Sequence, residues 1–255
     1  MNILVCMKQT FDTEEKIVLE NGKVKEDGVQ FIINPYDEYA IEEGIRLKEE
    51  LGGQVTLICV GPERSEEALR KGLAMGADEA VFVADETLFG DEFTISQVLA
   101  AVIKDRPFDI ILCGNQAVDD GSGQVAVRLA ELLNIPHIST ITKLEIQGAE
   151  VVANRDAEGD IEIITASLPI LVTAQQGLNE PRYPSLIGIR KANKKPMERL
   201  TAADLNLNGA EIAAKVQIVE TFLPTPKTGG KILSGDLADQ VKELVASLRN
   251  VDKVV

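Results

Sequence analysis

The sequence predicts an α/β fold: a doubly wound, mostly parallel, Rossmann-like sheet with an antiparallel extension and a C-terminal partner-wrapping arm. Apolar strand-like runs alternate with helix-length amphipathic stretches through the first half, a rhythm typical of parallel sheets with right-handed crossovers. After Asn134 the helical stretches stop, and beyond Tyr183 the apolar residues lose their periodicity. We therefore expect an α/β domain over residues 1–183 and an arm with a final helix over residues 184–255.

The strands and helices of the first half follow from local patterns. An Asn21-Gly22 pair between short apolar runs predicts a hairpin turn, and the apolar spacing after Pro35 predicts a helix that stops at Gly52. Buried strands are predicted at residues 2–7, at residues 55–61, and at the ends of the segments 65–85 and 94–114. Ligands of such sheets bind beyond the carboxyl ends of strands, where the strand order switches. The loops after Met7, Val60 and Gly114 lie at these ends and can converge on one nucleotide.

The segment from Gly114 to Val125, GNQAVDDGSGQV, is the most informative loop of the chain. An apolar strand precedes it and a helix-patterned segment follows it, the layout of a phosphate cradle. Gly121 and Gly123 permit positive φ and a close approach of a phosphate to the backbone, while Ser122 adds a hydroxyl donor. A plain strand-to-helix turn remains an alternative for this pattern, because it is neither a Walker loop nor a dinucleotide fingerprint.

Composition excludes several classes of function. A net charge of −15 argues against nucleic acid and anionic membranes, and basic residues are concentrated only at RKANKK, residues 190–195. The three cysteines lie in apolar strand runs, as expected of buried thiols in a reducing compartment. His137 is the single histidine and has no Cys-x-x-Cys neighbour, so no metal site is expected. The chain opens on a strand without a leader or a membrane span, which predicts a cytoplasmic protein.

The second half predicts a different organisation. Residues 138–175 alternate strand-like pieces with acidic turns, which favours antiparallel strands, and residues 236–251 regain helical spacing. Between them lie apolar residues without periodicity, which we expect a partner subunit to bury. These residues are Leu186, Ile187, Ile189, Leu200, Leu205 and Leu207.

Several motifs in one order carry a resemblance. The chain contains NPYDEYAIEEGIRLKE, LAMGADEAVFV, GNQAVDDGSGQ and LNEPRY-x-x-L, and ANRDAEGDIEIITASLPILVT spans residues 153–173. Over nearly its whole length it resembles the beta subunit of the electron transfer flavoproteins. The resemblance implies a heterodimer with an alpha subunit, FAD held mainly by alpha, and AMP held by beta. It also implies electron relay from acyl-CoA dehydrogenases of fatty acid β-oxidation, or similar flavoenzymes, to a membrane quinone oxidoreductase, with no catalytic residue on this chain.

The resemblance also implies which residues hold AMP. Its adenosine would lie against Cys6, Val60, Asn34, Pro35, Tyr36 and Asp37. Its ribose and phosphate would lie against Gly114, Asn115, Gln116, Ala117, Val118, Asp119, Asp120, Gly121, Ser122, Gly123, Gln124 and Val125. Helix capping alone is the alternative for Asn34 and Asp37. Because carboxylates repel phosphate, we expect Asp119 and Asp120 to face the ribose or the preceding backbone, and solvated turn residues are their alternative.

Two further positions are implied to contact partners. Asp156, in the hairpin RDAEGD, matches an acidic residue that pairs with an arginine of alpha, and an ordinary charged turn is the alternative. Leu186 matches an anchor leucine that enters a pocket on partner dehydrogenases, and packing within this chain or on alpha is the alternative. A small anchor suits a weak redox encounter, which requires rapid release.

The loop sequence also bears on a second flavin. Bifurcating, NADH-linked relatives hold a second FAD in the same cavity and resemble DGDTAQVG across the loop. Here the Asp-Gly order is reversed, Ser122 replaces threonine, and Ala126 replaces the closing glycine. We therefore expect AMP, and a bifurcating beta subunit and a stand-alone nucleotide-binding regulatory protein remain the alternatives.

Overall fold

The computed structural model describes residues 1–227, 229–251 and 253–254. The chain forms two compact units, each described by itself. The larger comprises Met1–Val18 and Val24–Val219, and the smaller comprises Leu19–Lys23 and Glu220–Val255.

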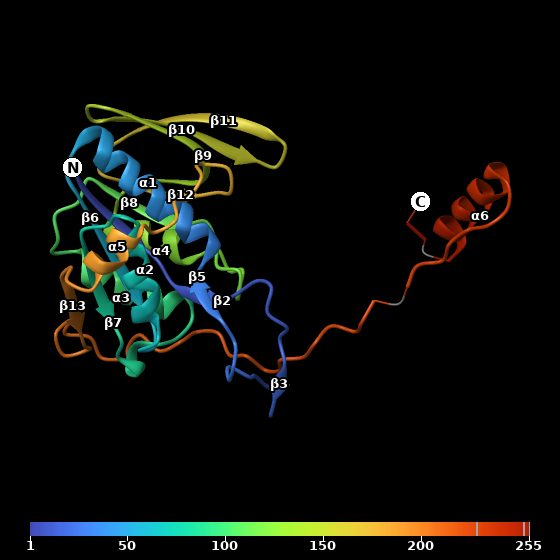
Figure 1. Cartoon of the computed structure of the whole chain (residues 1–255), viewed down its shortest axis with the longest axis horizontal. Coiled ribbons are helices and arrows are strands. Elements are labelled where there is room, and N and C mark those ends of the chain that lie inside the picture. The colour runs from blue at the N-terminus through green and yellow to red at the C-terminus, as the bar shows by residue number, and fades with distance from the viewer. Residues whose placement is uncertain (228, 252, 255) are drawn as a thin grey trace. The chain divides into compact units, whose positions relative to one another are not determined.

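A mixed sheet forms the centre of the larger unit (Figure 1). Its nine strands within the described residues are, in spatial order, β11 (Asp160–Ser167), β10 (Glu150–Ala157), β9 (His137–Gln147), β12 (Ile170–Ala174), β8 (Ile110–Gly114), β1 (Asn2–Cys6), β6 (Gln54–Val60), β7 (Glu79–Val83) and β13 (Met197–Leu200). The seven strands from β9 to β13 in this order are parallel, and the described antiparallel pairs of this sheet are β10 with β9 and β10 with β11. The predicted fold class, including the antiparallel extension, is confirmed.

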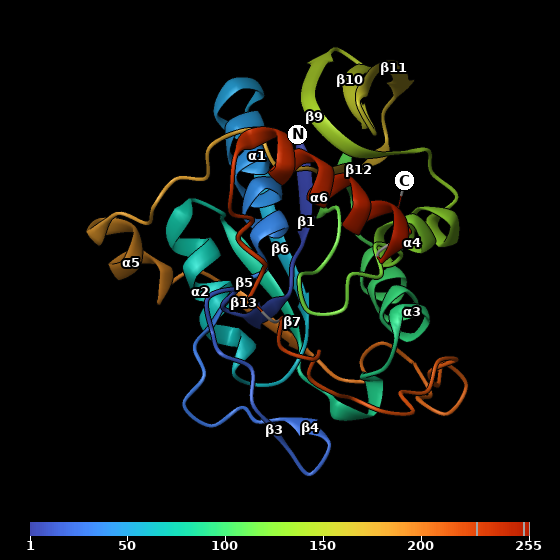
Figure 2. The ribbon, with the colours of Figure 1, turned by 90° about the vertical axis from the view of Figure 1, so that its right-hand side faces the viewer.

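Helices cover both faces of the parallel strands, as Figure 2 shows. Helices α1 (Pro35–Leu51) and α2 (Ser65–Met75) share one buried apolar cluster with Ile3 and Val5. Helices α3 (Glu92–Ile103) and α4 (Val125–Leu133) share the other with Leu4 and Cys6. Because successive side chains of a strand point to opposite faces, β1 contributes to both clusters and is buried on both sides.

Smaller elements complete the first half. Strands β2 (Gln9–Phe11) and β5 (Phe31–Ile33) pair antiparallel, β3 (Leu19–Glu20) pairs with β4 (Lys23–Val24), and η1 (Glu86–Leu88) precedes α3. The turn between β3 and β4 has positive φ at Asn21 (53°) and Gly22 (74°), which confirms the predicted hairpin.

Residues 184–219 belong to the larger unit and pack on it. Helix α5 (Leu186–Ala192) lies against α2, and β13 adds an edge strand beside β7. Leu205 is buried, and Leu200 and Leu207 pack against the same apolar cluster as α3 and α4. The expectation that a partner must bury these three leucines is therefore wrong, because the edge strand returns the chain to the sheet. Leu186, Ile187 and Ile189 stay exposed.

The smaller unit contains the final helix, α6 (Leu237–Asn250), which confirms the helix predicted from the apolar spacing. The Asp236 side chain accepts a hydrogen bond from the Asp239 backbone N–H at 3.0 Å and so caps the helix. No side chain of α6 is buried. Among the described residues, we found no helix with the length and apolarity needed to cross a membrane.

Candidate functional site

A cavity of about 840 Å³ opens at the carboxyl ends of the parallel strands. It lies where the strand order switches, because β1 is followed in the chain by strands on one side of it and then by β8 on the other. The position agrees with the general rule for ligand sites in open α/β sheets. Its wall comprises residues 6–8, Asn34, Asp37, Val60, residues 90–92, Ile95, Leu99, residues 113–117, Asp120, residues 122–126, Ala214 and residues 216–218.

Asp37 joins the two strands that flank the switch point. Its carboxylate accepts hydrogen bonds from the Lys8 backbone N–H at 2.8 Å and from the Gly114 backbone N–H at 3.1 Å. Lys8 directly follows Met7 beyond the end of β1, and Gly114 is the last residue of β8. The side chain is buried, and burial raises its pKa to about 7 against the opposing effect of these N–H groups. Asp37 therefore holds the cavity floor together from the first turn of α1.

Gly114 is required by this contact. A Cβ at Gly114 would lie 2.2 Å from Asp37 Oδ1 and 2.9 Å from the Asp37 backbone nitrogen. No side chain fits at such distances, so the end of β8 approaches the start of α1 as closely as it does only because the residue is glycine.

Asn34 uses its side-chain amide to hold the loop after β8. Its Nδ2 donates to the Gln116 carbonyl at 2.9 Å, and its Oδ1 accepts from the Val118 backbone N–H at 3.1 Å. Both ends of the amide are thus occupied within the chain, although Asn34 also lines the cavity. The structure therefore shows Asn34 shaping the loop, and it shows no side-chain cap of α1 by this residue.

Lys8 neutralises the two adjacent carboxylates of the loop. Its Nζ lies 2.9 Å from Asp119 and 3.2 Å from Asp120. Burial lowers the pKa of Lys8, but the two carboxylates outweigh it and hold the pKa above its ordinary value. Asp120 also accepts from the Ser122 backbone N–H at 2.9 Å. Both carboxylates are engaged with Lys8 and the loop backbone, so their charge is offset beside the cavity.

The glycines of the loop adopt the conformation that their position predicts. Gly121 and Gly123 have φ of 65° and 60°, values that side-chain-bearing residues rarely adopt. The chain then enters α4, whose first-turn N–H groups have no intrahelical acceptor. Gly123 to Ala126 all line the cavity. The residues present therefore fit an anionic group, which the helix start and its dipole stabilise without a basic side chain.

Most of the residues expected to hold a nucleotide meet at this cavity. Those on its wall are Cys6, Asn34, Asp37, Val60, Gly114, Asn115, Gln116, Ala117, Asp120, Ser122, Gly123, Gln124 and Val125. Five others lie next to these residues in the chain but off the wall: Pro35 and Tyr36 in the first turn of α1, and Val118, Asp119 and Gly121 in the loop after β8.

The opposite wall of the cavity was not predicted from the sequence. Asp91 caps α3 through the Thr94 backbone N–H at 3.1 Å, and its other oxygen accepts from the backbone N–H groups of Lys215 (2.6 Å) and Val216 (2.9 Å). It thereby fixes the segment 214–218 on the cavity wall. The loop from β7 to α3 also lies at the carboxyl edge of the sheet, so its Asp-Glu pair before a helix was the available signal.

The cysteines and His137 show no sign of a metal site. Cys6, Cys59 and Cys113 are buried free thiols, and burial raises the pKa of Cys59 to about 12. His137 is exposed at the start of β9. In the described part of the chain, no three His, Cys, Asp or Glu side chains gather in a way that would hold a metal ion.

The two expected partner contacts lie on the surface. Leu186, the first residue of α5, is 78% exposed. Asp156 is exposed near the end of β10. Their roles toward partners remain predictions.

Comparison with known proteins identifies the class. The family model of the electron transfer flavoprotein domain matches residues 21–205, which include most of the cavity. The chain is 58% identical over 257 aligned positions to the electron transfer flavoprotein subunit beta of Bacillus subtilis, with complete coverage of both chains. It is 32% identical to the subunit beta of Bos taurus, covering 100% of this chain and 99% of the relative. It is also 35% identical to a subunit of the caffeyl-CoA reductase-Etf complex of Acetobacterium woodii, covering 98% of each.

The chain therefore belongs to the electron transfer flavoprotein family, as a beta subunit. It serves electron transfer in association with flavin and is not an enzyme, as the resemblance implied.

Proposed function

We propose that this chain pairs with an alpha subunit in a heterodimer, binds AMP in the cavity at the sheet's switch point, and relays electrons between flavoproteins. The observation that carries the proposal is the meeting of the loop after β1, the last residue of β6 and the loop after β8 around one cavity that ends at the start of α4. FAD would be held mainly by the alpha subunit and would supply the redox chemistry.

The chemistry of the wall supports a nucleotide with a phosphate at one end. The loop glycines and the start of α4 suit the phosphate, and the pairing of Asp119 and Asp120 with Lys8 reduces repulsion there. Apolar side chains such as Val60, Ile95 and Leu99 line other parts of the wall and suit the flat faces of a base. Asn34 and Asp37 contribute by holding the loop and the floor in place.

The choice between AMP and a second FAD rests on the loop sequence. A cavity of about 840 Å³ has room for more than a mononucleotide, and one relative is named as a subunit of a caffeyl-CoA reductase complex. A bifurcating, NADH-linked beta subunit with two flavins per heterodimer is therefore the second candidate. The pattern that bifurcating relatives resemble has threonine and glycine at the positions of Ser122 and Ala126. This difference favours AMP.

The proposed electron route runs from acyl-CoA dehydrogenases or similar flavoproteins to a quinone oxidoreductase. Exposed Leu186 supports docking of a donor, because a single apolar side chain buries little area and allows rapid exchange. Exposed Asp156 would pair with an arginine of the alpha subunit and hold the flavin domain between encounters.

Mass spectrometry of the ligands released from the denatured heterodimer tests the proposal. We expect one AMP and one FAD per heterodimer. Two FAD and no AMP would establish the bifurcating candidate, and a chain isolated as a stable monomer without flavin would refute the heterodimer. Gly123→Val should lose AMP but retain FAD, whereas Gly148→Val is a matched control, because Gly148 has a similar φ of 64° in the turn between β9 and β10.

A further inference from the structure

Helix α5 is too short to be stable by itself. It has seven residues, of which only Ala192 is buried. Isolated helices below about 12–15 residues are marginal in water, so tertiary contacts must hold α5. Those contacts determine where Leu186 lies.

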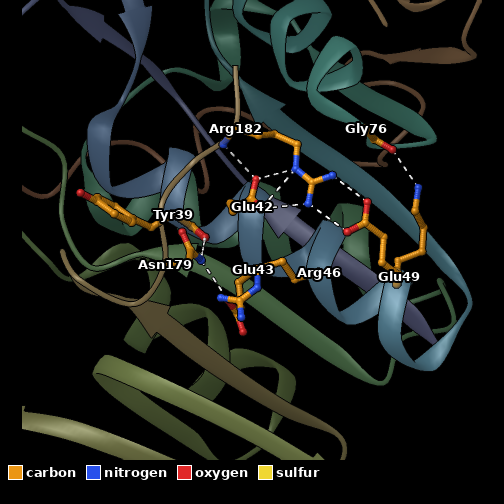
Figure 3. A network of polar contacts seen from close by, with 9 residues as sticks. Tyr39, Glu42, Glu43, Arg46, Glu49, Gly76, Asn179 and Arg182 are labelled. Carbon is orange, nitrogen blue, oxygen red and sulfur yellow. Dashed lines mark hydrogen bonds and ion pairs between the residues drawn. The ribbon is translucent and has the colours of Figure 1, made fainter. Parts of the chain in front are cut away.

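Arg182 provides the contact on the N-terminal side of α5. Its Nε donates to Glu42 Oε2 at 2.9 Å, and its Nη1 donates to Glu49 Oε1 at 2.6 Å. Its backbone N–H also donates to Glu42 at 3.1 Å. Figure 3 shows the guanidinium between the two carboxylates, which lie two turns apart on α1. The Glu42 side chain is only 5% exposed, so Arg182 pairs with a nearly buried charge.

The backbone around Arg182 is conformationally restricted, and a second side chain, Asn179, attaches it to α1. Pro181 and Pro184 fix φ on both sides of it and favour extended backbone in the residues that precede them. Asn179 Nδ2 donates to the Tyr39 carbonyl at 3.0 Å and to Glu43 at 2.9 Å, also on α1 (Figure 3). The linker from Asn179 to Arg182 is thus held along one face of α1.

The other end of α5 is fastened to α2. Arg70 Nη1 donates to the carbonyls of Ala192 at 3.0 Å and of Lys195 at 3.3 Å, the kind of cation that stabilises a helix C-terminus. Lys195 Nζ donates in return to the Leu73 carbonyl at 2.8 Å. Between these ends α5 lies close to α2, because a Cβ at Gly188 would be 2.3 Å from the Ala74 carbonyl oxygen.

We propose that Arg182, with Glu42 and Glu49, is a positioning residue for partner docking: it fixes α5 so that Leu186 is presented in one orientation. The inference rests on the proposed docking role of Leu186. Arg182 touches neither partner nor cofactor in this scheme. It acts by removing conformational freedom before the encounter, so that docking does not require α5 to become ordered.

The test compares two double variants of the heterodimer. Each removes one cationic and one anionic side chain and so leaves the net charge unchanged. Arg182→Gln with Glu42→Gln removes the ion pair without leaving a buried charge unpaired. Lys71→Gln with Glu38→Gln is the matched control, because it removes an ion pair of 2.7 Å between α2 and the same helix α1. The readouts are KM and kcat for reduction of the heterodimer by a purified acyl-CoA dehydrogenase, and hydrogen exchange of the α5 amides.

We expect the Arg182 variant to raise KM roughly ten-fold with kcat within about two-fold, while α5 amides exchange roughly ten-fold faster. The control should match wild type. Adding Leu186→Ala to the Arg182 variant should raise KM little beyond Leu186→Ala alone, because both act on one contact. Gly188→Ala, which displaces α5 without changing charge, should reproduce the rise in KM.

Four results would overturn the proposal. Unchanged α5 exchange in the Arg182 variant would show that the ion pair does not hold the helix. A normal KM with faster exchange would show that the position of α5 is irrelevant to docking, and additive effects with Leu186→Ala would show that Arg182 acts elsewhere. If Leu186→Ala alone has a wild-type KM, the docking role proposed above is wrong, and this inference is refuted with it.

Discussion

Because the Asp37 carboxyl is buried, we predict that it makes the free energy of unfolding depend on pH. One substitution should remove this dependence. Burial raises its pKa from the ordinary 3.8 to about 7. The folded state therefore binds this proton more tightly than the unfolded state does. The stabilisation from the protonated group is complete below about pH 4 and is lost as the pH rises toward 7.

The magnitude follows from the size of the shift. One pKa unit corresponds to about 1.4 kcal/mol, so the group loses about 3 kcal/mol of stabilisation between pH 5 and pH 8, most of it below pH 7. Asp37→Asn cannot titrate, although it leaves the N–H of Lys8 or Gly114 without an acceptor at a constant cost of about 1–3 kcal/mol. The stability of the variant relative to wild type should therefore improve by about 3 kcal/mol from pH 5 to pH 8.

Urea unfolding of both heterodimers at one protein concentration between pH 5 and pH 8 measures this difference. The groups beside Asp37 keep their charge in this window, because the pKa of Lys8 is raised and the pKa of the Cys59 thiol is about 12. Parallel curves for the two proteins would refute the reasoning, since Asp37 would then be ionised throughout. Parallel curves would also result if the N–H groups of Lys8 and Gly114 outweighed burial, because a folded-state pKa below 3.8 leaves the carboxyl ionised in both states throughout this window.

Three further predictions concern the loop, the anchor and the C-terminal segment. Gly123→Val should lower AMP retention, measured by mass spectrometry, because φ at this position is 60° and a β-branched residue is strained there; unchanged AMP would exclude the cradle. Leu186→Ala should cost about 1.5–3 kcal/mol in donor docking with little change in Tm, because its side chain is 78% exposed; a large fall in Tm would make it a core residue. Deletion from Pro184 should destabilise the sheet unit in thermal melting, because it removes β13 and buried Leu205, whereas deletion from Glu220 should leave the core of that unit intact; equal Tm values for the two truncations would contradict this account.

The sequence was sufficient to predict the parallel sheet and its switch point. Runs such as NILVCM and VTLICVG are typical of strands buried on both faces, and the carboxyl ends of parallel strands share one edge of the sheet. The cavity at that edge follows from topology and not from any single motif. The glycine loop was also visible, because positive φ at Gly121 and Gly123 is a local requirement that composition reveals.

Other features depended on contacts between distant segments. Strand β13 has the sequence MERL, whose central charged pair gives no strand alternation, and its pairing with β7 is what defines it. From the sequence, Asn34 was expected to contact the nucleotide. Its side-chain amide donates to the Gln116 carbonyl, which lies 82 residues away in the sequence. Glu42 and Glu49 both pair with Arg182, which lies 140 residues from Glu42 in the sequence. No periodicity can report such partners.

Helix α1 contacts both the cavity and the linker to the proposed docking surface. Its first turn holds the cavity floor through Asp37, and its later turns hold the linker to α5 through Glu42 and Glu49. At Gly44, between these contacts, a Cβ would lie 3.1 Å from Val5 and 3.3 Å from Leu112, so the helix lies tightly on β1 and β8. Because one helix packed this closely contacts both sites, neither can move relative to the other without disturbing the buried core. The cavity and the proposed docking surface therefore belong to one fixed frame, which α1 holds together.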